Sequence, residues 1–162
     1  MTKYSFVGKL LKRVAISMGV VLIFIQFVPY GRSHSNPPAS GEPAWDSAQT
    51  RVLAKRACFD CHSNETQWPW YSHVAPVSWL MENDVTGGRN KLNFSEWNLP
   101  QKEAGESAQQ LSSGKMPQWF YVAVHPHARL TPDERQTLIA GLSATGAPQE
   151  EKRSRHSEKD EH

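Results

Sequence analysis

The sequence predicts a small all-α domain with long loops. Its 162 residues leave room for one small domain and some appended segments. Apolar residues recur at the spacing of one helix face in four stretches, and no stretch alternates convincingly between apolar and polar residues. At 38% hydrophobic and 10% aromatic residues, the chain is too apolar to be wholly disordered.

Residues 1–30 have the pattern of a membrane anchor. Basic residues without any acid precede an uncharged apolar run at residues 14–30. As a helix this run would span roughly 26 Å, against a hydrocarbon core of about 30 Å. We therefore expect one N-terminal transmembrane helix, with its basic flank in the cytoplasm and the rest of the chain across the membrane. A cleaved secretory signal is the alternative, and it would also export the domain.

Three further segments follow. Residues 31–44 are rich in Pro, Ser and Gly and are predicted to form a flexible linker. Residues 45–148 form the predicted folded domain, and residues 149–162 mix charges without an apolar residue, which is typical of disorder. The formal net charge of +2 is not that of a nucleic-acid binder. The sequence does not indicate an oligomeric state.

Four stretches of the domain are predicted as helices from their apolar faces: residues 44–57, 76–85, 100–112 and a last helix that begins at Thr131. Gly87 and Gly88 are expected to end the second of them. The last helix has the clearest start, because Thr131 and Glu134 are spaced as a capping box. Four modest helices bury little apolar surface, so we expect a staple such as a disulfide, a metal or a large cofactor.

The two cysteines of the chain lie in Cys58-Phe59-Asp60-Cys61-His62. Two cysteines three residues apart with a histidine directly after them form the attachment sequence of a c-type haem. The thiols of Cys58 and Cys61 would bond the porphyrin covalently, and the imidazole of His62 would be the proximal iron ligand. We therefore expect one covalently attached haem c.

Two other interpretations of this motif stay open. A thioredoxin-like redox pair would need a βαβ context, which the sequence lacks. Half of a zinc site would need two further ligands, and His73, His125 and His127 could supply them.

The second axial ligand decides what such a haem does. Met116 is the first candidate, because it lies in a polar loop beside Pro117 and not on a periodic apolar face. His73, His125 and His127 are the other candidates. Methionine favours reduced iron and fills the coordination sphere, which suits electron transfer. Arg89 is a possible partner of a haem propionate.

The segment from Cys58 onward resembles the haem-binding domain family of bacterial c-type cytochromes. The features that carry the resemblance are residues 58–64, 68–72, 75–80, 84–85, 88–89, 92–97, 116–117, 125–126, Ala128, Leu130, Thr131 and Glu134. The resemblance implies a cytochrome c-like helical fold around a covalent haem. It also implies Cys58 and Cys61 as attachment points, His62 as proximal ligand and Met116 as distal ligand.

These expectations combine into a membrane-tethered, monohaem electron carrier. It would be a single-pass protein of the bacterial inner membrane with its C-terminal domain in the periplasm. Its partners would be redox proteins of the membrane or periplasm, and it would not be an enzyme. The alternative is a haem-based sensor or a peroxidase-like enzyme with an open or displaceable distal position. A third possibility is a zinc or interaction module without haem.

Overall fold

The computed structural model describes residues 2–146, and the regular secondary structure in that range is helical, without a regular β-strand. The predicted all-α class is confirmed for this part of the chain. The predicted disordered tail, residues 149–162, lies outside the described residues. The described chain divides into two units, residues 2–34 with 68–84, and residues 35–67 with 85–146.

The first unit begins with α1, Thr2–Ile25, and also contains η1, Trp70–His73, and the first half of α4, Val77–Lys91. After α1, the Gln26 side chain donates to the carbonyl of Leu22 (2.9 Å) and to that of Ala75 (2.8 Å). The His34 ring stacks on Trp68, with 4.6 Å between ring centroids. Side-chain contacts of this kind join the two parts of the unit.

The prediction of an N-terminal transmembrane helix is wrong for this structure. None of the helices in residues 2–146 combines the length and the apolar character that a membrane span needs. The helix α1 takes in the basic flank and ends at Ile25, before the last residues of the predicted apolar run. Of the predicted apolar run, residues 14–25 are helical, which gives about 18 Å against a core of about 30 Å.

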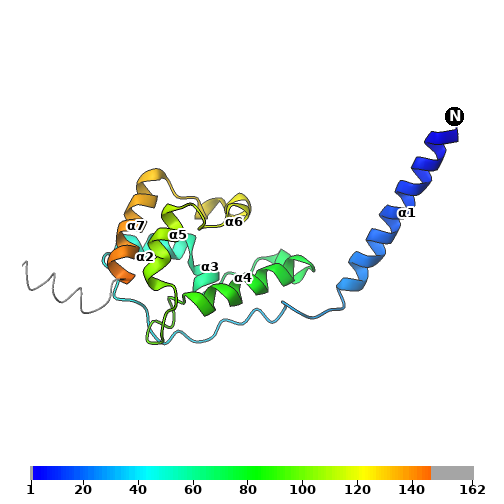
Figure 1. The fold of residues 1–162 in the computed structure, drawn as a ribbon. Coiled ribbons are helices and arrows are strands. Elements are labelled where there is room, and N and C mark those ends of the chain that lie inside the picture. Colours follow the sequence, from blue (N-terminus) through cyan, green and yellow to red (C-terminus); the bar gives the residue numbers. More distant parts are fainter. Residues whose placement is uncertain (1, 147–162) are drawn as a thin grey trace, which may run out of the picture. The chain divides into compact units, whose positions relative to one another are not determined.

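The second unit packs three helices around one apolar core. These are α2 (Ala48–Ala57), α5 (Ser107–Ser112) and α7 (Pro132–Gly146), and α7 contacts both α2 and α5 (Figure 1). The smaller elements are α3 (Phe59–His62), η2 (Ala104–Glu106), α6 (Trp119–Val124) and η3 (Pro126–Ala128). The buried core consists of Leu53, Ala54, Phe59, Leu92, Phe94, Ala108, Leu111, Leu138 and Leu142.

Side-chain caps mark the starts of two helices, and the cap of the second was predicted. The hydroxyl of Ser47 accepts the Thr50 N–H (3.1 Å) at the start of α2. At α7 the Thr131 hydroxyl accepts the Glu134 N–H (3.2 Å) and the Glu134 carboxylate accepts the Thr131 N–H (2.8 Å). This confirms the capping box and explains why the last helix is the one that the sequence places best.

The helix α4 runs through both glycines that were expected to end it, and it stops only at Lys91. Gly88 lies so close to the backbone of Cys61 that a β-carbon there would overlap the Cys61 carbonyl oxygen. Glycine therefore serves here to let a helix pass close to α3, and not to terminate it.

Part of the segment predicted as a linker is bonded within the second unit. The N–H groups of Ser40 (2.8 Å) and Gly41 (3.2 Å) donate to the carbonyl of Ser95, and the Gly41 carbonyl accepts the Trp97 N–H (2.9 Å). The Glu42 carboxylate pairs with Arg51 of α2. These bonds place residues 40–42 against the loop that follows α4.

Candidate functional site

The turn that carries the two thiols begins where α2 ends. The N–H of Cys58 donates to the carbonyl of Ala54 (2.8 Å), so that Cys58 closes the helix. Its own carbonyl accepts the N–H groups of Cys61 (3.2 Å) and His62 (2.9 Å). The thiols of Cys58 and Cys61 and the imidazole of His62 therefore project from one short helical turn, and neither cysteine is in a disulfide.

The first residue between the cysteines fixes this turn to the core. Phe59 is 2% exposed and stacks on Phe94, with 5.5 Å between ring centroids. Trp45 packs against the same pair of rings. Because aromatic side chains contribute a large buried area, the turn is held rigidly to the body of the second unit.

His62 is arranged as a neutral metal ligand. Its Nδ1 lies 3.1 Å from the carbonyl oxygen of Leu92. A carbonyl can only accept, so Nδ1 carries the proton and the lone pair stays on Nε2. Burial lowers the pKa of His62, which favours the neutral ring. The His62 carbonyl also accepts the Phe94 N–H (2.8 Å), which fixes the backbone of the residue.

The Cys58 thiol does not have the character of a reactive redox thiol. Burial raises the pKa of Cys58 to about 12, and the neighbouring Cys61 adds to this shift. Catalytic thiols instead have a lowered pKa, because the thiolate is the nucleophile. This environment does not support the thioredoxin-like interpretation.

The second residue between the cysteines belongs to a polar network that the sequence analysis missed. The Oδ2 atom of Asp60 accepts a hydrogen bond from the hydroxyl of Tyr121 on α6 (2.6 Å), and Oδ1 accepts the Gln67 N–H (3.0 Å). Burial and the bond to Asp60 both raise the pKa of Tyr121, so its hydroxyl remains a donor. The His125 ring stacks on Tyr121 at 4.1 Å. In the sequence, the position of Asp60 between the two cysteines is the one signal that could have indicated this network.

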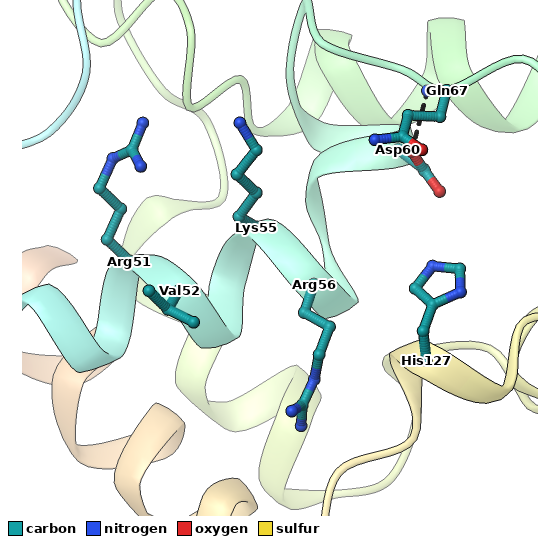
Figure 2. Close-up of a pocket in the computed structure, with 7 residues that line it drawn as sticks. All are labelled: Arg51, Val52, Lys55, Arg56, Asp60, Gln67 and His127. Carbon is teal, nitrogen blue, oxygen red and sulfur yellow. Dashed lines mark hydrogen bonds between the residues drawn. The ribbon is translucent and has the colours of Figure 1, made fainter.

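A polar hollow of about 420 Å³ lies on the side of the motif where Asp60 is found. Figure 2 shows that α2 supplies four of its lining side chains, α3 supplies Asp60 and η3 supplies His127. Its three cations form ion pairs within the unit: Arg51 with Glu42, Lys55 with Glu65 and Arg56 with Glu134. Neither thiol nor His62 contributes to the lining of this hollow.

The candidates for a second axial ligand lie in different surroundings. Met116 is 36% exposed and follows α5, where its N–H donates to the carbonyl of Gln110 (3.1 Å). His73 contacts the ring of His34 at 4.2 Å in the first unit. The Nδ1 atom of His125 lies 3.0 Å from the Tyr121 carbonyl, and its ring meets that of His127 at 5.6 Å. The assignment of Met116 stays a prediction.

Arg89 is bonded to protein acceptors on both sides of the motif. Its Nε donates to the carbonyl of Ser63 (2.7 Å) and its NH1 to that of Ser35 (2.9 Å). Its NH2 donates to the side-chain oxygens of Asn36 and Thr66, each at 2.9 Å. A propionate would have to compete with these acceptors, and the propionate contact stays a prediction.

The tryptophans separate into several environments. Trp45 and Trp97 pack against the apolar core of the second unit. In the same unit Trp119 is 81% exposed. In the first unit Trp68 stacks on His34, and Trp70 is exposed.

The residues present fit a covalently bound haem. Two thiols outside any disulfide and a histidine whose Nδ1 is bonded to the Leu92 carbonyl lie on one turn, which is the donor set that thioether attachment and proximal ligation require. Within residues 2–146, no group of three His, Cys, Asp or Glu side chains is placed to hold a metal ion. The zinc interpretation therefore gains no support from the described geometry.

A family model described as a haem-binding domain matches residues 20–144. No curated protein and no solved structure matches the chain significantly, so the cytochrome c-like form of the helical fold stays an expectation.

Proposed function

The chain belongs to the haem-binding domain family, and from this premise we propose that it is a monohaem c-type cytochrome that carries single electrons. The observation that carries the proposal is the turn from Cys58 to His62, with two thiols outside any disulfide and an imidazole whose Nδ1 proton is already bonded to Leu92. Cys58 and Cys61 would hold the haem through thioether bonds, and His62 would bind its iron through Nε2.

A bound haem supplies a one-electron iron couple. The role of the protein is to hold the proximal ligand, His62, in place. The Leu92 carbonyl orients the His62 ring and increases the electron density on Nε2. Phe59, packed into the core, keeps the turn in place when the charge of the site changes.

The distal ligand in this proposal is Met116. A thioether sulfur stabilises reduced iron and raises the potential, and a six-coordinate iron has no open position for a substrate. We therefore propose an electron carrier and not an enzyme. Its partners would be redox proteins outside the cytoplasm, because bacteria complete thioether attachment there.

The first test is covalent attachment. The purified protein should retain haem in a denaturing gel and stain for it, and the double variant Cys58→Ser/Cys61→Ser should not. Met116→Ala is the matched control, because it removes a distal ligand and leaves both thiols. Absence of stain from the unmodified protein would exclude the proposal.

The second test concerns the ligand. The oxidised protein should show the sulfur-to-iron charge-transfer band, and Met116→Ala should abolish it. If the band persists in this variant, another residue is the ligand.

One observation favours a second candidate function, a haem sensor or a peroxidase-like enzyme. Met116 is 36% exposed, so that a small ligand could displace it without opening a packed core. Carbon monoxide distinguishes the two functions. An electron carrier should bind it slowly and incompletely in the reduced native state, whereas rapid and complete binding would support the sensor or enzyme.

A further inference from the structure

The helix α6 is held in the second unit without any buried side chain of its own. None of the residues of Trp119–Val124 is buried. The helix contacts η3, and η3 contacts α2. Since apolar packing contributes little at α6 itself, its position depends strongly on the polar bonds that it makes.

The strongest of these bonds ends on the attachment motif. The Tyr121 hydroxyl donates to the Asp60 carboxylate at 2.6 Å, the short distance of a charge-assisted bond. Asp60 is itself fixed by two further bonds. Its side chain accepts the Gln67 N–H (3.0 Å), and its backbone carbonyl accepts the hydroxyl of Thr66 (2.7 Å). The donor is fixed as well, since the His125 ring stacks on it. The bond thus joins two well-defined side chains 61 residues apart.

The segment with Met116 lies between α5 and α6 and is attached to both. At one end the carbonyl of Gln110 accepts the N–H groups of Lys115 and Met116, each at 3.1 Å. At the other end the Gln118 carbonyl accepts the Val122 N–H (3.1 Å), which starts α6. Because only Pro117 separates Met116 from Gln118, the position of α6 sets that of Met116.

We propose that Tyr121 is a positioning residue for Met116. Its bond to Asp60 connects the helix after Met116 to the residue between the two attachment cysteines. Together with the bonds from Lys115 and Met116 to Gln110, this hydroxyl group thereby sets the position of the distal segment relative to the proximal turn. This inference rests on the proposed function, in which Met116 is the distal ligand.

The test uses the holoprotein and the variant Tyr121→Phe, which removes the hydroxyl and keeps the ring that stacks on His125. We expect the variant to retain covalent haem, to show a weaker sulfur-to-iron band and to bind carbon monoxide about tenfold faster in the reduced state, as the loss of one charge-assisted bond implies. Tyr30→Phe is the matched control, because Tyr30 is an exposed tyrosine of the first unit. It should keep the band and the rate of the unmodified protein.

Three outcomes would count against the inference. If Met116→Ala abolishes the band but Tyr121→Phe keeps both band and carbon monoxide rate, the positioning role is refuted and the proposed function stands. If Tyr121→Phe lowers only the unfolding midpoint, its role is merely structural. If Met116→Ala keeps the band, the ligand assignment of the proposed function fails, and this inference fails with it.

A second variant covers the case in which Tyr121→Phe yields too little folded protein. Asp60→Asn keeps an acceptor oxygen for Tyr121 and removes the charge. We expect its carbon monoxide rate to lie between those of the unmodified protein and of a variant without the bond. A rate equal to that of the unmodified protein would refute the inference.

Discussion

Gly88 of α4 passes so close to Cys61 of α3 that a β-carbon on Gly88 would overlap the Cys61 carbonyl oxygen and lie 3.2 Å from the Cys61 β-carbon. This approach brings α4 against the turn that carries both thiols and His62. Neither partner can yield easily, because both contacts involve backbone or the first side-chain carbon. The absence of a side chain at Gly88 is therefore a condition for the geometry of the motif.

We predict that Gly88→Ala destabilises the protein by about 1–3 kcal/mol, the usual result of overpacking, and lowers the yield of covalent haem. The added methyl group must push α4 away from Cys61. Urea unfolding of the holoprotein and a haem stain normalised to protein would measure the two effects.

Gly87→Ala is the matched control, one residue away in the same helix. Nothing lies within 4 Å of a β-carbon at Gly87. Alanine is the better helix former, so this variant should be stabilised by about 0.5–1 kcal/mol. If both variants behaved alike, the close approach to Cys61 would not be what requires glycine at residue 88.

The two glycines also show where sequence reasoning stops. In the sequence, Gly87 and Gly88 have the pattern of a helix end. A glycine that ends a helix and a glycine that allows close packing look the same until the packing partner is known, and here that partner is Cys61. The capping box at Thr131 is predicted correctly, because all of its atoms lie within four residues.

The placement of the cysteines and His62 on one turn was predictable from the sequence for the same reason. The residues Cys58 to His62 form a local motif, and their placement on one turn follows from it. The bond between Asp60 and Tyr121 was not predictable, because it joins residues 61 positions apart. The end of α1 at Ile25 was also missed, because hydropathy does not show where the helical hydrogen bonds stop.

The ion pair between Arg56 and Glu134 predicts an acid-sensitive contribution to stability. The hydrogen bond from Arg56, with that from the Thr131 N–H, lowers the pKa of Glu134 from 4.5 to about 2. The ionised carboxylate therefore stabilises the folded state at neutral pH, and this contribution disappears as the pH falls from about 4.5 towards 2. Glu134→Gln should lower the urea midpoint at pH 6 and make little difference near pH 2.

The control for this experiment is Asp133→Asn, which removes the neighbouring acid of the first turn of α7. It should have a smaller effect on the urea midpoint, since exposed charges at a helix start contribute only a few tenths of a kcal/mol to about 1 kcal/mol. An equal effect in both variants would assign the loss to the helix dipole and not to the pair with Arg56.

Phe59 provides a test of how the motif is anchored. It is nearly fully buried and packs on Phe94 and Trp45. Phe59→Ala should cost about 3–5 kcal/mol, the range for large buried aromatic residues. We expect most of the protein molecules to lack covalent haem as well, because both thiols project from the turn that Phe59 anchors. Phe27→Ala changes an exposed phenylalanine and should leave both stability and haem content unchanged.

Arg89 allows the structural role and the propionate contact to be separated. Its guanidinium bonds Ser63 and Thr66 after the motif, and Ser35 and Asn36 before α2. A lysine has one nitrogen and cannot reach acceptors in four places, so Arg89→Lys should cost about 2 kcal/mol in unfolding free energy.

The midpoint potential of the haem in the same variant tests the propionate contact. A potential that stays near that of the unmodified protein would mean that Arg89 joins the segment before α2 to the segment after the motif, because its N–H groups donate to acceptors in both. A clear shift of the potential, with the covalent haem retained, would instead show that the charge of Arg89 acts on the haem and would support the propionate contact.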